Sequence, residues 1–224
     1  MSTSTSAGGN SRMVLLLVTG IPLTMILAAS WLWYFVAQGN LDLVSAIGTA
    51  NRGALIEPPR SLTDTRFSDD AGGGYVWIDS EPRWTMVVVN QGGYCDRACE
   101  RRLYITRQIH ISLGKEFNRV RRVYISDQSI ASNTVEVPDA PLEGWPEQLT
   151  DNQFFVLVEQ MHNGLLPLSV APTVIYALFP EVVVAPNQWY LVDPAGWIMM
   201  RFSDELGYKD VLFDLKFLLK NSGG

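Results

Sequence analysis

The sequence is poor in metal-binding and charged side chains: among its 224 residues there are two cysteines and two histidines, and 18% are charged. Two cysteines are too few for a disulfide-rich scaffold, and 12 prolines and 18 glycines without a repeat exclude collagen-like and low-complexity chains. An excess of basic residues is also lacking, since the formal net charge is −6, and this argues against nucleic-acid binding. With 47% hydrophobic residues, the length predicts one folded unit with appendages.

Residues 13–37 carry no charged side chain. A helix of this length, at about 1.5 Å per residue, reaches across a hydrocarbon core of roughly 30 Å, so we predict a transmembrane helix. The run is longer than the apolar part of a cleaved signal peptide, and it ends in Trp31, Trp33 and Tyr34, which are typical of membrane interfaces. We therefore expect a retained anchor, with a cleaved signal peptide as the alternative.

The charges that flank this helix predict its orientation. Arg12 is the only ionisable side chain before it, and the first one after it is Asp42. An excess of positive charge marks the cytoplasmic side, so we expect a single-pass protein with its N-terminus inside and its C-terminal domain outside. In a Gram-negative bacterium this means the inner (cytoplasmic) membrane and the periplasm. Residues 1–12 are rich in Ser, Thr and Gly and predict a disordered tail.

Beyond the helix, the pattern predicts two further regions. Residues 38–82 hold turn formers without a sustained period and are expected to form a stalk and an irregular lead-in. Residues 83–222 alternate strand-like and helix-like segments and predict a folded domain. The expected strands are 85–89, 120–125, 154–158, 173–178, 189–192 and 197–202. One expected helix, of about 18 residues, begins near Ala98 and stops at Gly114, and a second spans 208–219. A loop is expected at 135–151.

A strand, a cysteine turn, a helix, a strand, a later hairpin and a closing helix follow one another in the order of a thioredoxin-like α/β domain. Together with the N-terminal membrane helix, the Cys-x3-Cys turn and the run 189–202, this domain resembles the SCO/SenC proteins of cytochrome oxidase assembly over residues 83–222. Residues 51–59 and 103–110 resemble those of divergent SCO-like membrane proteins found with bacterial oxidase assembly factors.

Cys95 and Cys99 are the candidate site. Their spacing at the start of a helix puts both sulfurs on one face, near enough for a disulfide or for chelation of a metal by two thiolates. Unpaired helix N–H groups and nearby basic side chains favour the thiolates, and nearby acids oppose them. The basic residues are Arg97, Arg101 and Arg102, and the acids are Asp96 and Glu100. The resemblance implies that the pair either binds Cu(I) with a distal histidine or exchanges disulfides with another copper protein.

Two features of the sequence weaken the copper hypothesis. The family's histidine would fall within 184–188, and no histidine is present there. His110 and His162 do not match that position, and the sulfurs of Met161, Met199 and Met200 are expected in the core. No cofactor is therefore assured, with copper as the candidate. Whether Pro186 follows a cis peptide bond, as in other thioredoxin folds, stays open.

The sequence predicts a membrane-anchored factor for respiratory oxidase assembly that acts in copper delivery or in thiol maintenance of a copper-binding partner. Cys95, at an exposed helix start, would attack a partner disulfide and Cys99 would resolve it, so that the chain would be a thiol–disulfide oxidoreductase. The expected partner is an oxidase subunit or another assembly factor. The alternatives are a structural disulfide and a non-catalytic scaffold that binds oxidase subunits or lipid. Residues 97–122 hold eight basic and two acidic residues, which predicts a positive surface for an acidic partner or anionic lipid.

Overall fold

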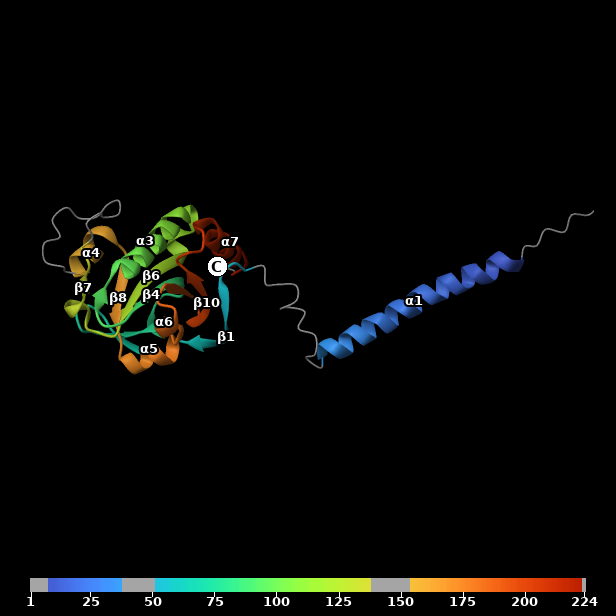
Figure 1. Ribbon diagram of the computed structural model, residues 1–224, viewed down its shortest axis with the longest axis horizontal. Coiled ribbons are helices and arrows are strands. Elements are labelled where there is room, and N and C mark those ends of the chain that lie inside the picture. Colours follow the sequence, from blue (N-terminus) through green and yellow to red (C-terminus); the bar gives the residue numbers. More distant parts are fainter. Residues whose placement is uncertain (1–7, 38–50, 138–153, 223–224) are drawn as a thin grey trace, which may run out of the picture. The chain divides into compact units, whose positions relative to one another are not determined.

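The computed structural model describes residues 8–37, 51–137 and 154–222 (Figure 1). The chain divides into two compact units, Met1–Ala50 and Asn51–Gly224. In the first unit, α1 (Gly8–Ala37) contains the stretch Met13–Trp31, which is long and apolar enough to cross a membrane, with a mean hydropathy of 2.2. The predicted membrane helix is therefore confirmed as a candidate span. It begins earlier than expected, because residues 8–12 of the expected tail are helical, and the rest of that tail lies outside the described residues.

The second unit is built on an eight-stranded mixed sheet in the order β1-β10-β9-β4-β6-β8-β2-β3. Its strands are β1 (Ala54–Ser61), β2 (Arg66–Ser68), β3 (Gly74–Val76), β4 (Trp84–Asn90), β6 (Val120–Ser126), β8 (Leu165–Ser169), β9 (Gln188–Val192) and β10 (Trp197–Ser203). A separate two-stranded sheet joins β5 (Tyr94–Cys95) to β7 (Thr134–Val135).

The centre of the sheet has the pairing of a thioredoxin-like domain. β4, β6 and β8 run parallel, with Val87 opposite Val123 and Val123 opposite Leu166. On the other side of β4, β9 and β10 run antiparallel and form the predicted hairpin, in which the N–H of Gly196 donates to the carbonyl of Asp193. All seven residues of β4 are buried, as its continuous apolar and β-branched run predicted. The predicted α/β thioredoxin-like fold is confirmed.

Helices cover both faces of this sheet (Figure 1). On one face, α3 (Arg97–Ser112), α4 (Phe154–Met161) and α7 (Tyr208–Asn221) share one hydrophobic core; on the other, α5 (Pro172–Leu178) and α6 (Glu181–Val184) cover a second. Three short 3-10 helices complete the described fold: η1 (Trp77–Asp79), η2 (Gly114–Arg119) and η3 (Ile130–Ser132). α3 ends two residues before Gly114, whose φ of +59° suits glycine and stops the helix as expected.

Two predicted strands are helices in the structure. Residues 154–158 belong to α4, which buries Phe154, Leu157, Val158 and Met161. This spacing is that of one helix face, which a short apolar run conceals. Residues 173–178 belong to α5, where Pro172 occupies the first turn, a position that suits proline because its missing N–H would have no partner there.

Other strands were missed. β8 contains Pro167, which is unusual within a sheet, and so its run was not recognised as a strand. The expectation that residues 38–82 are irregular is wrong for β1, β2 and β3, which are short or carry prolines and polar residues and lie at the sheet's two edges. Of the loop expected at 135–151, residue 135 lies in β7, and residues 138–151 lie outside the described residues.

Candidate thiol site

The structure brings the two cysteines together at the turn that leads from β4 into α3. Cys95 ends β5, Cys99 lies in the first turn of α3, and the two form a disulfide with Cα atoms 5.2 Å apart. Gly92 and Gly93 make the tight turn before them, with φ values of +78° and +68° that residues with a Cβ rarely adopt. The sulfurs therefore lie on one face, as the four-residue spacing predicted.

Both cysteine side chains are fully buried, and the expectation of an exposed Cys95 is wrong. Cys95 is covered because β5 pairs with β7, a strand about 40 residues further along the chain. Two backbone hydrogen bonds hold this pair: the N–H of Thr134 donates to Gly93, and the N–H of Glu136 donates to Cys95, at 2.8 and 2.9 Å. The neighbouring Tyr94 is 52% exposed, so the strand that carries Cys95 has one side chain at the surface.

Carboxylates, rather than sulfur, occupy the N-terminus of α3. Asp96 is the N-cap, and its Oδ1 accepts the N–H of Cys99 at 2.8 Å. The N–H of Arg97 donates to Glu136 Oε2 at 3.0 Å. These N–H groups, which were expected to stabilise a thiolate, are thus already paired with negative charge. The site consequently favours the disulfide or the neutral thiols over the thiolates.

Glu100 is a buried acid in the first turn of α3, directly after Cys99. Its side chain is 4% exposed, and its Oε1 has no hydrogen-bond partner within the described part of the chain. Burial raises the pKa of Glu100 to about 7, against the lowering effect of the nearby Arg97 charge. Burial therefore favours the protonated form of this carboxyl in the folded chain.

A buried polar network supports the cysteine turn from below. The amide of Asn90 donates to the backbone carbonyl of Tyr94 and to the hydroxyl of Tyr124, both at 3.1 Å. The amide of Asn133 reaches the same hydroxyl at 3.3 Å, and the hydroxyl of Ser126 donates to Asn133 at 3.2 Å. Burial raises the pKa of Tyr124, so its hydroxyl stays neutral. The network links the ends of β4 and β6 to the segment that covers Cys95.

The two histidines lie away from the cysteines. The Nε2 of His110, in the last turn of α3, is 2.9 Å from the backbone oxygens of both Phe117 and Val120. His110 follows Cys99 by about three helical turns, which is too far for a shared ligand set. Met161 and Met200 are buried in the core as predicted, and Met199 packs against it.

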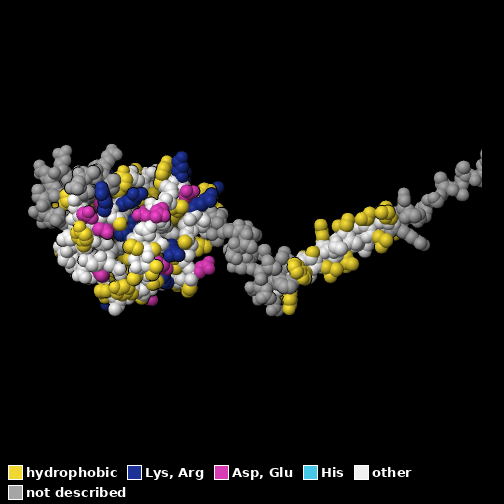
Figure 2. Space-filling view, in the orientation of Figure 1, with side chains coloured by type: hydrophobic (Ala, Val, Ile, Leu, Met, Phe, Trp, Pro, Cys, Tyr) yellow, Lys and Arg dark blue, Asp and Glu magenta, His cyan; other side chains and the backbone are white. Residues whose placement is uncertain are grey.

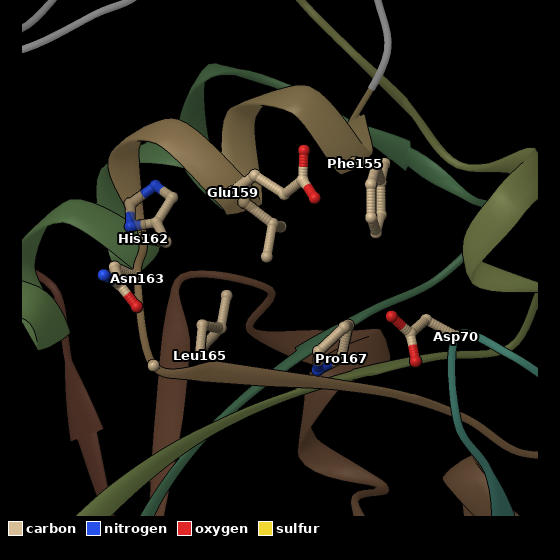
Figure 3. Close-up of a pocket in the computed structure, with 9 residues that line it drawn as sticks. Asp70, Phe155, Glu159, His162, Asn163, Leu165 and Pro167 are labelled. Carbon is tan, nitrogen blue, oxygen red and sulfur yellow. The ribbon is translucent and has the colours of Figure 1, made fainter.

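His162, after the end of α4, is fully buried, and its burial together with nearby arginines lowers its pKa to about 3. It borders a hollow into which Glu159 projects from α4, across from Leu165 and Pro167 of β8 (Figure 3). Neither cysteine lines this hollow. Among residues 8–37, 51–137 and 154–222, no group of three or more His, Cys, Asp or Glu side chains is arranged to hold a metal ion.

Residues 84–154 and 167–222 match the family described as the transmembrane-like, thioredoxin-like, C-terminal domain. The chain belongs to this family. No match was found among the curated proteins.

The solved structure of yeast Sco1 supports the fold of this transmembrane-like, thioredoxin-like chain. Yeast Sco1 aligns with a TM-score of 0.51 at 12% identity, covering 79% of this chain and 99% of Sco1. A SCO1/SenC family lipoprotein from Bacillus anthracis aligns with a TM-score of 0.49 at 15% identity, covering 73% and 99% of the two chains. The thioredoxin domain of a thiol-disulfide oxidoreductase from Bacteroides vulgatus has a TM-score of 0.43 at 12% identity, covering 71% and 95%. At 12% identity, the likeness to yeast Sco1 is one of fold.

In this transmembrane-like, thioredoxin-like domain, residues 184–188 precede or open β9. Because β9 runs antiparallel to β4, its start lies at the same end of the sheet as the cysteine turn. The cis peptide bond in the described chain is Glu57–Pro58, so Pro186 follows a trans bond. Residues 184–188, where the resemblance would place a histidine, therefore lie at the end of the sheet that carries the cysteine turn, and they supply no imidazole.

Proposed function

We propose that this protein is a membrane-anchored thiol–disulfide exchange factor that maintains the cysteines of a copper-binding partner during respiratory oxidase assembly. The observation that carries the proposal is the Cys95–Cys99 disulfide at the strand-to-helix turn of a thioredoxin-like domain. A bridge between residues four apart closes almost no loop, so it adds little stability by constraining the unfolded chain. Redox use explains such a bridge better than a structural role.

Direct copper delivery has weaker support. Reduced Cys95 and Cys99 would offer two soft thiolates that suit Cu(I). Among the described residues, no His, Asp or Glu side chain joins the two cysteines in a group arranged to hold a metal, and His110 and His162 have other surroundings. Copper, if carried, would be cargo on a two-thiolate site rather than a resident cofactor.

The exchange begins with the reduced chain. The thiolate of Cys95 attacks one sulfur of a partner disulfide, and the partner's other sulfur leaves as a thiolate. The thiolate of Cys99 then attacks the Cys95 sulfur in the mixed disulfide, which releases the second partner thiolate and leaves the Cys95–Cys99 disulfide. Two electrons pass to the partner, and a dithiol reductant must restore the reduced pair.

Cys95 is the better candidate for the attacking residue because less structure holds it in place. It ends a two-residue strand fixed by two backbone hydrogen bonds to the β7 segment, whereas Cys99 is part of a 16-residue helix. Displacing β5 from β7 would expose Cys95 and leave α3 intact. The weak thiolate stabilisation next to Asp96 favours a reducing pair, since stabilised thiolates make a dithiol a stronger oxidant.

The proposed partner is an oxidase subunit or another assembly factor outside the cytoplasm. The SCO/SenC resemblance supports the assembly role, and the α1 anchor would place the domain beside a membrane-bound oxidase. Arg97 and Arg101 are exposed next to the disulfide and suit an acidic partner. The flanking charges of α1 support the periplasmic location.

A trapping experiment tests the proposal. The full chain in detergent micelles, as Cys99→Ser, is mixed with the copper-binding oxidase subunit whose ligand cysteines are oxidised. We expect a long-lived mixed disulfide through Cys95, and the matched Cys95→Ser variant should form much less. If neither variant forms an adduct, the protein is not an exchange factor, and a non-catalytic scaffold that binds oxidase subunits or lipid would be the better account.

A further inference from the structure

One face of α7 carries exposed aromatic and basic side chains together. Phe213 and Phe217 are 56% and 57% exposed, although the opposite face of the helix buries Val211, Leu215 and Leu219. Three lysines share their side of the helix at helical spacing. We define the α7 face as Lys209, Phe213, Lys216, Phe217 and Lys220, all of which are exposed.

The acids of α7 do not neutralise this face. Asp214 is 2% exposed, and its Oδ2 accepts the N–H groups of Arg52 and Gly53, both at 2.8 Å. Asp210 lies 3.6 Å from the guanidinium of Arg52 and forms an ion pair with it. The α7 face is therefore locally positive in a chain whose formal net charge is −6.

The surface continues onto η2. Arg119 donates to the backbone oxygens of Leu219 and Ser222 at 2.8 and 2.7 Å, which fixes η2 against the end of α7. η2 also carries Phe117, which is 42% exposed and stacks on His110, and the exposed Lys115, which lies 3.9 Å from Glu116. Figure 2 shows dark-blue basic and yellow hydrophobic side chains over α3 and α7, with magenta acidic side chains among them.

The chain itself indicates what this surface meets. Residues 38–50 separate α1 from the second unit, and 13 residues span at most about 45 Å when fully extended. The folded unit begins at Asn51, and the next two residues, Arg52 and Gly53, bind Asp214 of α7. The membrane anchor is thus tethered through a short segment to the very helix that carries the α7 face.

We propose that the α7 face docks on the headgroup region of the membrane that α1 spans. Phenylalanines with flanking lysines suit this region, because the rings enter the boundary with the acyl chains while the ammonium groups meet anionic headgroups. The disulfide stays free, because it lies at the N-terminal end of α3, whereas η2 follows the C-terminal end of that helix. This inference does not depend on the proposed thiol exchange.

Quenching of a site-specific label by membrane lipid tests the proposal. The full chain, with its native disulfide intact, carries one added cysteine as Phe213→Cys or as Tyr176→Cys and is labelled with the same fluorophore. Tyr176 is the matched control, because it is 52% exposed on α5, which covers the other face of the sheet. Both proteins are reconstituted in vesicles of phosphatidylcholine and phosphatidylglycerol that contain a lipid with a spin-labelled headgroup.

We expect clearly stronger quenching at position 213 than at 176. The quenching at position 213 gives the ratio of docked to undocked protein. Adding Lys216→Gln or Lys220→Gln should reduce this ratio by about fivefold each, and vesicles of phosphatidylcholine alone should reduce it further. Equal quenching at the two positions in anionic vesicles would overturn the proposal. Quenching at position 213 that depends on the protein-to-lipid ratio and not on the lipid charge would also overturn it, because the α7 face would then bind a second copy of the chain.

Discussion

Asp96 is the residue whose replacement separates stability from thiol chemistry at this site. Its Oδ1 caps α3 by accepting the N–H of Cys99, and its negative charge lies in the same turn as that cysteine. Asp96→Asn keeps an oxygen acceptor and removes the charge, whereas Asp96→Ala removes both. We expect the two variants to differ in stability and both to raise the reactivity of the reduced thiols.

General values for N-caps and for nearby charges give the size of both effects. Loss of an N-cap costs about 1 kcal/mol, so Asp96→Ala should lower Tm by about 2–4 °C, and Asp96→Asn should lower it by less. Removing a charge near a thiol changes its ionisation by about 1 kcal/mol, which lowers its pKa and raises the thiolate fraction about fivefold. Because nucleophilicity falls with pKa, the alkylation rate of the reduced chain at neutral pH should rise only about twofold in both variants.

Calorimetry of the full chain in micelles gives Tm. Alkylation of the reduced chain, quenched at set times and followed by mass spectrometry, gives the alkylation rates of the thiols. If Asp96→Asn destabilises the chain as much as Asp96→Ala, the capping oxygen does not contribute as argued. If neither variant changes the alkylation rate, the Asp96 carboxylate does not suppress thiolate formation.

Three further predictions concern the anchor, copper and pH. N-terminal sequencing of protein extracted from membranes should find a chain that begins near residue 1, and a start beyond residue 30 would disprove the retained anchor. In competition with a Cu(I) chelator, the reduced chain should bind Cu(I) more weakly than SCO/SenC proteins that keep the histidine. His110→Ala and His162→Ala should leave its Cu(I) affinity unchanged. Tight binding that is lost in either variant would refute this prediction. Glu100 loses its proton near its ordinary pKa in the unfolded chain and near 7 in the folded chain, so the free energy of unfolding should fall by up to about 3 kcal/mol as pH rises from 4.5 through 7. In denaturant titrations, Glu100→Gln should flatten this pH dependence. An unchanged slope would show that another group causes it.

The sequence alone was sufficient to predict a helix or strand where the hydrophobic residues of the segment followed a long or unambiguous period. The buried run of β4 and the apolar stripe of α7 were both predicted, since each is continuous enough for only one interpretation. The same reasoning failed for α4 and α5, because five or six apolar residues fit a buried strand as well as a helix. Pro172 at the start of α5 was the available signal.

The proximity of the two cysteines was predicted from the sequence, and their surroundings were not. The spacing of Cys95 and Cys99 was enough to place their sulfurs together. The burial of Cys95 depends on β7, and pairing with so distant a strand leaves no local pattern in the sequence. The capping role of Asp96 could have been predicted, because an Asp directly before a helix is a common N-cap.

The central claim is that Cys95 and Cys99 form a redox pair in which Cys95 attacks. Its most direct test is brief treatment of the reduced, folded full chain with a limiting amount of alkylating agent, followed by mass spectrometry of the labelled peptides. We predict that the pair is reduced without denaturant and that Cys95 is labelled before Cys99. A disulfide that is reduced only in denaturant, two inert thiols, or Cys99 labelled first would contradict the claim.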